Sequence, residues 1–144
     1  MKDFKHKTLL QLRFKDTDAV GHINNACHLT FFELGRMVYF EHVLGKGLHT
    51  NKTGMIVARA TVDYIKPILL EYTVHIHNAC TRVGNKSFEI HHSIVHTLPD
   101  GSETELATGQ VIIVTYDYTK QISVSVPDAW RDAFNRFENL AVPR

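Results

Sequence analysis

The sequence predicts an α+β fold in which one antiparallel β-sheet curls around a long, buried helix. Two observations predict it. Residues 26–44 are apolar at three- and four-residue steps and around most of the helical circumference, so this helix needs cover on several sides. After residue 54 the chain alternates apolar and polar residues in segments that short turns join, which is typical of antiparallel strands.

Composition sets the limits of the interpretation. A chain of 144 residues has the length of one ordinary domain, so we expect a single domain over residues 1–144. The hydrophobic fraction of 44% and the charged fraction of 22% are typical of a globular protein. The formal net charge of +1 argues against a nucleic-acid partner held by bulk charge.

The first strand is expected over residues 8–15, where Leu10, Leu12 and Phe14 alternate with polar residues. The long helix is expected to follow a loop. Asn24 or Asn25 supplies a capping oxygen at its start, and Gly45 and Gly47 end it.

Four further strands and a short helix complete the chain. The expected strands are Met55–Ile65, Tyr72–Val83, Ser87–Thr97 and Glu105–Tyr118. Tight turns are expected at Gly84-Asn85 and over residues 98–102. Pro127 lies near the first turn of the terminal helix, whose apolar stripe is Trp130, Phe134 and Phe137.

The two cysteines, Cys27 and Cys80, lie far apart and form no Cys-x-x-Cys motif. We expect two small, partly buried thiols in a reducing compartment. The N-terminal residues lack the apolar segment of a signal peptide, and no apolar run approaches the length of a membrane span. We therefore expect a cytoplasmic protein without a membrane partner.

The loop between the first strand and the long helix reads Asp-x-x-Gly-His-x-Asn-Asn over residues 18–25. Within residues 13–36 it is followed by a Phe-Phe-Glu-x-x-Arg helix. With Val62–Pro67, Val83–Phe88, and Val114–Asp117 leading to Val126-Pro127, this segment resembles the hotdog-fold thioesterases, in the 4-hydroxybenzoyl-CoA thioesterase-like branch. The resemblance runs from Leu10 to about Phe134. It implies the hotdog fold, with one curved antiparallel sheet wrapped around a long central helix and a short C-terminal helix.

The resemblance implies that Asp18 is the catalytic carboxylate, acting as a nucleophile or as a general base on water. The amide near Asn25, at the positive end of the helix dipole, would polarise the substrate carbonyl. Gly21 allows a tight turn with space for the thioester, and His22 would orient or bind near the carboxylate.

Two other carboxylates compete for the catalytic role. We expect Asp16 to orient the loop or to pair with Arg13. Glu33 is a possible helix-borne acid, as in some other hotdog branches. Its spacing of three residues from Arg36 favours a helical ion pair instead.

Four residues are expected to contact the substrate. Lys86 matches the family hairpin that binds the nucleotide end of coenzyme A across a subunit boundary, and Arg82 and Arg59 are further candidates for its phosphates. His28 stands where many relatives carry an aromatic residue, usually Tyr, close to the substrate channel. It therefore bears on acyl specificity.

Four strand histidines, His75, His77, His91 and His92, invite a metal interpretation. No cysteine or carboxylate joins them at ligand spacing, so we expect ordinary strand histidines and no metal. The expected chemistry needs no cofactor.

The sequence therefore predicts an acyl-CoA thioesterase that forms a homodimer or homotetramer by joining sheets at their edges. One alternative is a thioesterase acting on acyl carrier protein in lipid or polyketide synthesis. The other is a non-catalytic hotdog protein that binds acyl-CoA.

Overall fold

The computed structural model describes residues 3–46 and 52–141. Its elements are β1 (His6–Leu10), a 3₁₀ turn (Phe14–Asp16), α1 (Cys27–Leu44), β2 (Thr53–Tyr64), β3 (Val74–Val83), β4 (Ser87–Thr97), β5 (Glu103–Asp117), β6 (Ile122–Ser123) and α2 (Asp128–Glu138). The sheet is antiparallel in the order β1-β3-β4-β5-β2, with β6 paired to β5. The α+β class is confirmed. Within the described residues, neither helix is long and apolar enough to cross a membrane.

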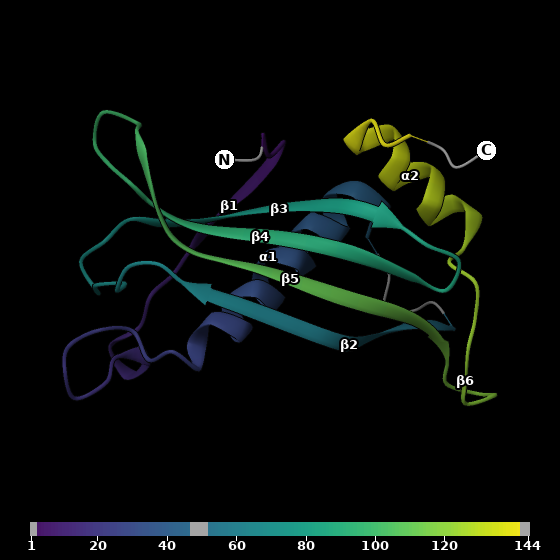
Figure 1. Cartoon of the computed structure of the whole chain (residues 1–144), viewed down its shortest axis with the longest axis horizontal. Helices are drawn as coiled ribbons and strands as arrows, with labels where there is room; N and C mark the ends of the chain where they lie inside the picture. The colour runs from purple at the N-terminus through teal and green to yellow at the C-terminus, as the bar shows by residue number, and fades with distance from the viewer. Residues whose placement is uncertain (1–2, 47–51, 142–144) are drawn as a thin grey trace.

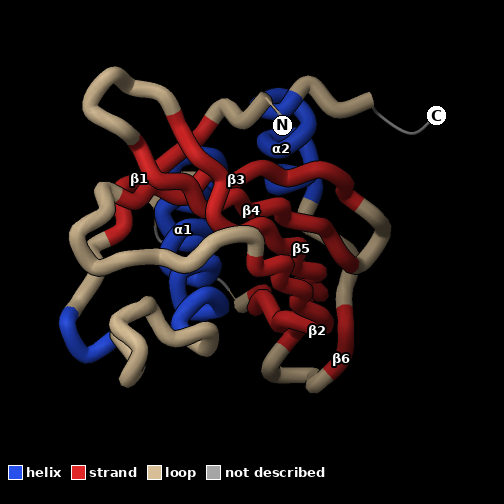
Figure 2. The backbone as a smooth tube through the Cα atoms, turned by 60° about the vertical axis from the view of Figure 1, so that its left-hand side comes forward, coloured by secondary structure: helices blue, strands red, loops and turns tan. Residues whose placement is uncertain are grey.

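The helix α1 lies across one face of the sheet, where it contacts mainly β1 and β3, and α2 packs against β3 and α1 (Figures 1 and 2). The core between them is aromatic: Phe134 of α2 lies 5.0 Å from Phe88 and 6.2 Å from Tyr39, measured between ring centroids. Phe32 is fully buried against β5, where a Cβ on Gly109 would overlap its ring. Each such ring stabilises the fold by about 1.5–3 kcal/mol relative to an exposed one.

The predicted burial of α1 is only partly confirmed. The helix is 18 residues long, and its inner face, including Phe32, Tyr39 and Phe40, is buried. The opposite face is open to solvent in the single chain, although it carries large apolar residues. These are Leu29, Leu34, Met37 and Val38, which are 44–53% exposed. The sheet and α2 of one chain therefore cover only part of the helix.

The prediction for the first strand is wrong beyond Leu10. Arg13 and Asp16 close a 3₁₀ turn at residues 14–16, because the Asp16 carboxylate accepts hydrogen bonds from the backbone N–H and the guanidinium of Arg13. The chain has already left the sheet after Leu10, and this turn lies between the strand and the loop before α1. Phe14, which was expected to face the core, is 82% exposed.

The other boundaries agree with the predictions to within about two residues. The last helical residue of α1 is Leu44, and Gly45 follows with φ of 91°. Gly47 lies outside the described residues. Cys27 and Cys80 are both free thiols, the first half-buried and the second buried.

Candidate active site

The loop before α1 is tied into the fold by backbone hydrogen bonds. Thr17 and Ile23 form an isolated β-bridge, and His22 bridges to Leu69. The Ile23 N–H donates to the Ile68 carbonyl at 2.8 Å. These bonds fix both ends of the turn formed by residues 18–22, which lies at the same end of the sheet as the start of α1 (Figure 1).

Asp16 stabilises the conformation of this loop, as expected from the sequence. Its carboxylate is 4% exposed and lies 2.8 Å from the Arg13 guanidinium. The Arg13 hydrogen bonds hold the pKa of Asp16 below its usual range. The Asp16 carbonyl also accepts the Asn24 N–H at 2.7 Å, so Asp16 connects both sides of the loop.

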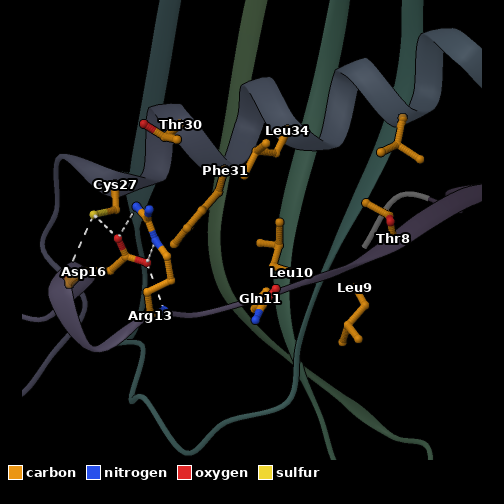
Figure 3. A pocket seen from close by; sticks show the side chains of 11 residues that line it. Thr8, Leu9, Leu10, Gln11, Arg13, Asp16, Cys27, Thr30, Phe31 and Leu34 are labelled. Atoms are coloured by element: carbon orange, nitrogen blue, oxygen red, sulfur yellow. Dashed lines mark hydrogen bonds and ion pairs between the residues drawn. The ribbon is translucent and has the colours of Figure 1, made fainter.

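The Arg13–Asp16 pair closes one end of a groove of about 480 Å³ between β1 and α1 (Figure 3). Leu10, Phe31 and Leu34 line its walls. Its acid is already in an ion pair, and burial together with the Asp16 charge raises the pKa of the Cys27 thiol. This groove therefore offers neither a free carboxylate nor an activated thiol.

Asp18 has the opposite environment. Its side chain is exposed, and Oδ1 accepts hydrogen bonds from the backbone N–H groups of Val20 at 2.9 Å and His22 at 3.3 Å. Oδ2 makes no hydrogen bond with the described residues. Gly21 closes the turn with φ of 86°, a conformation that side chains rarely adopt. The turn thus orients the carboxylate and leaves one oxygen available.

The turn from Asn24 to Cys27 leads into α1. The Cys27 N–H donates to the Asn24 carbonyl at 2.9 Å, and the Ala26 N–H donates to Asn24 Oδ1 at 2.9 Å. Asn24 itself donates to Asp16. Of the four amides in this turn, only that of Asn25 has no acceptor among the described residues. The predicted side-chain cap is wrong: the N-cap of α1 is Ala26, no side chain caps the helix, and Asn24 Oδ1 accepts the Ala26 N–H in the turn before it.

The carbonyl of Asn25 has two donors. Tyr64, the last residue of β2, donates its hydroxyl to this oxygen at 2.8 Å, and His28 Nδ1 lies 3.2 Å from it. The two rings contact each other edge to face at 4.6 Å. Burial lowers the pKa of His28, so its imidazole is neutral at neutral pH and Nδ1 carries the proton that it donates.

A cleft of about 400 Å³ brings these groups together. Its lining includes Asp18, His22, Asn25, His28, Tyr64 and Lys66. Four of the predicted site residues therefore line one cleft, and Gly21 lies in the turn beside it. Tyr64 and Lys66 were not among the predicted site residues, although the segment Val62–Pro67 that carries them is part of the family resemblance.

The predicted phosphate-binding residues lie elsewhere in the chain. Tyr64 pairs with Ala107 on β5, whereas Ser87, next to Lys86, pairs with Val114. That stretch of β5 spans roughly 23 Å at about 3.3 Å per residue. Arg82 borders a different cleft of about 470 Å³ together with Arg131, and Arg59 lies exposed on β2. One chain does not bring these three cations to Asp18.

Glu33 is exposed on α1 and does not line the Asp18 cleft. The predicted Glu33–Arg36 ion pair is wrong as a direct contact, since the ion pairs among residues 3–46 and 52–141 are Lys7–Glu103, Arg13–Asp16 and His77–Glu103. Burial lowers the pKa of Arg36 against the opposing effect of the Glu33 charge.

The strand histidines are engaged separately. His75 Nδ1 lies 2.8 Å from Thr97 Oγ1, His77 Nε2 lies 2.7 Å from Glu103, and His92 Nδ1 lies 2.8 Å from Asn78. Burial lowers the pKa of His92 to about 3, so it is a neutral core residue. No group of three or more His, Cys, Asp or Glu in the described ranges could hold a metal ion.

A family model described as "Thioesterase-like superfamily" matches residues 12–134. The chain is 25% identical over 120 residues to the acyl-CoA thioester hydrolase YbgC of Escherichia coli O157:H7, covering 82% of this chain and 87% of that protein.

Solved structures of similar proteins have the same fold. A thioesterase from Thermus thermophilus, complexed with coenzyme A and Zn, is 28% identical, with a TM-score of 0.82 over 99% of this chain and 100% of that one. A mutant 4-hydroxybenzoyl CoA thioesterase complexed with 4-hydroxybenzoyl CoA, 16% identical, has a TM-score of 0.74 over 90% and 97% of the two chains. At that identity the likeness shows the fold alone. The predicted family is confirmed: this chain belongs to the thioesterase-like superfamily.

Proposed function

We propose that this protein hydrolyses acyl-CoA thioesters to a free acid and coenzyme A, with Asp18 as nucleophile or general base. One observation carries the proposal. Asp18, an exposed carboxylate with one free oxygen, and Asn25, whose N–H has no acceptor among the described residues, line the same cleft at the start of α1. Thioester hydrolysis needs these two groups, an activated attacker and a donor for the carbonyl oxygen.

The proposed reaction has two possible forms, which differ in how Asp18 acts. As a base, the Asp18 carboxylate takes a proton from water, whose oxygen adds to the carbonyl carbon. As a nucleophile, it adds directly and forms a mixed anhydride that water then cleaves. In both forms the C–S bond breaks and the thiolate of coenzyme A leaves, taking up a proton. The Asn25 N–H would donate to the oxyanion, and a donor of this kind contributes about 2.7–4 kcal/mol of transition-state stabilisation.

A second subunit is part of the proposal. β2 is a 12-residue strand at the edge of the sheet, and Ile56 to Ala60 along it are exposed. A long uncovered edge is a template for pairing. Antiparallel pairing of two β2 strands would bring the Lys86 hairpin of one chain toward the Asp18 end of the other. Binding of the coenzyme A phosphates by Lys86, Arg82 and Arg59 would then occur across the interface of a homodimer, or of a homotetramer built from two dimers.

The oligomeric state tests this part directly. Val57→Lys places a charge on the β2 edge, where 45% of Val57 is exposed. We expect a shift toward monomer in light scattering, together with a higher KM for acyl-CoA. The matched control is Leu98→Lys in the turn after β4, where Leu98 is 38% exposed. If Val57→Lys and Leu98→Lys have the same mass and the same KM as the unsubstituted protein, the edge is not the interface.

The catalytic assignment is tested by thiol release from a panel of acyl-CoAs and acyl carrier protein substrates. We expect turnover by the unsubstituted protein and a loss of at least about 100-fold in kcat for Asp18→Asn, because the amide keeps the turn and loses the charge. Glu33→Gln, outside the cleft, should keep full activity.

The alternatives give different results in the same assay. Higher kcat/KM on carrier-bound acyl groups would identify an acyl carrier protein thioesterase. Tight binding of acyl-CoA without turnover would identify a binding protein. Full turnover by Asp18→Asn, or a loss with Glu33→Gln instead, would overturn the role of Asp18. The cytoplasmic location expected from the sequence stays part of this proposal.

A further inference from the structure

We infer that Tyr64, together with His28, is a positioning residue. By bonding the carbonyl of Asn25, the two side chains hold the backbone of Asn25 so that its own N–H faces the cleft. The inference rests on the proposed function for its catalytic consequence, but its geometric content stands separately. Tyr64 comes from the end of β2, far in sequence from the loop, and its hydroxyl bonds the backbone of Asn25 at 2.8 Å.

The two peptide groups that flank the Asn25 Cα are both pinned. The peptide before it is held through the Asn24 carbonyl, which accepts the Cys27 N–H. The peptide after it is held at one end by Asn24 Oδ1 on the Ala26 N–H, and at the other by Tyr64 and His28 on the Asn25 carbonyl. With both planes fixed, the direction of the Asn25 N–H is fixed as well. Preorganised donors of this kind stabilise an oxyanion without reorganisation during the reaction.

The Tyr64 hydroxyl and the His28 ring also affect the electrostatic potential inside the cleft. A peptide carbonyl carries a partial negative charge, and the Asn25 carbonyl lies beside the cleft in which negative charge would develop on the substrate. Hydrogen bonds from the Tyr64 hydroxyl and the neutral His28 ring offset that charge. Loss of one donor leaves the carbonyl less compensated and freer to rotate toward the cleft.

Tyr64 is poorly placed for a role in the core. It is 53% exposed, and its ring contacts the His28 ring at 4.6 Å. Tyr64→Phe keeps the ring and its contact with His28 and removes the hydroxyl alone. The variant should therefore fold normally and change the hydrogen bonding of one carbonyl.

The experiment compares Tyr64→Phe with a matched control, Tyr118→Phe, which removes a hydroxyl from a tyrosine that is 59% exposed and lies outside the cleft. We expect kcat to fall roughly tenfold for Tyr64→Phe with KM changed less than twofold, since the interaction acts on the transition state. Tyr118→Phe should be unchanged in both constants.

Amide NMR supplies a readout that does not depend on activity. The ¹⁵N–¹H resonance of Asn25 should shift, and its order parameter should fall, in Tyr64→Phe but not in Tyr118→Phe. An unchanged Asn25 resonance, or a rise in KM at constant kcat, would overturn the inference. If the unsubstituted protein releases no thiol from any acyl-CoA, the proposed function fails, and the NMR comparison alone decides the role of Tyr64.

Discussion

Asp16 and Asp18 stand two residues apart in one loop and have opposite environments. Asp16 is 4% exposed, bonded to Arg13, and has a lowered pKa. Asp18 is exposed, accepts two backbone N–H groups through one oxygen, and borders a cleft. The loop thus uses one carboxylate to set its shape and leaves the other available for chemistry. Residue type alone cannot make that division; the partners of each carboxylate make it.

The largest expected difference between the two is in catalysis. Asp16→Asn should lower kcat/KM by less than about tenfold, whereas Asp18→Asn should lower it by at least about 100-fold, because only Asp18 would meet the substrate. Thiol release with a single acyl-CoA measures both. Equal losses would show that the loop acts as a unit and would remove the division of roles.

The turn at Gly21 gives a second comparison, with a control in the same chain. Gly21 and Gly101 both have φ of 86°, and a Cβ added at either position would meet open space. An alanine at either position should destabilise the protein by about 1–2 kcal/mol through backbone strain. Only Gly21→Ala should also lower kcat, because its turn orients the Asp18 carboxylate. Thermal unfolding and kinetics of both variants test this, and a matching loss of activity in Gly101→Ala would contradict it.

A smaller effect on the stability of the fold is expected when the Arg13–Asp16 ion pair is removed. Asp16→Asn should lower the free energy of unfolding by about 1 kcal/mol, because the amide oxygen still accepts the Arg13 N–H but the amide NH₂ cannot accept from the guanidinium, and solvent screens the exposed Arg13. Asp18→Asn should change it by less than about 0.5 kcal/mol, because an amide oxygen still accepts the two N–H groups. Urea unfolding of both variants provides the measurement.

Acid should produce the smallest difference, and its sign follows from the lowered pKa of Asp16. A carboxyl whose pKa is depressed on folding stabilises the protein above its ordinary pKa of about 3.9. That stabilisation is lost as the pH falls through the lower, folded value. Asp16→Asn should therefore lose less stability than the unsubstituted protein between pH 4 and pH 2, as urea unfolding at each pH would show. Parallel curves would mean that the ion pair contributes nothing.

Much of the fold follows from local pattern. The alternation of apolar and polar residues predicted β2 to β5, and all four strands form. The Arg13–Asp16 pair was among the expected roles of Asp16. The first strand was extended too far because Leu12 and Phe14 continue the alternation after the strand has ended at Leu10 and the chain has led into the 3₁₀ turn at residues 14–16. Period-two patterning carries no information about such a turn.

Other features depend on contacts that a sequence does not display. The exposed apolar residues of α1, such as Leu34 and Met37, have the same pattern whether the same chain or another one covers them. Tyr64 reaches Asn25 only because β2 ends beside the start of α1, across 39 residues of sequence. The separation of Lys86 from Asp18 follows from strand register, which becomes visible only once the strands are paired.

The central claim is that the Asp18 carboxylate and the Asn25 N–H meet the same thioester. A crystal structure of Asp18→Asn bound to an intact acyl-CoA tests it most directly. We predict the thioester carbonyl oxygen within about 3 Å of the Asn25 nitrogen and its carbon about 3–3.5 Å from the side chain at position 18. A thioester bound out of reach of both groups, in the β1–α1 groove beside Asp16 for example, would contradict it.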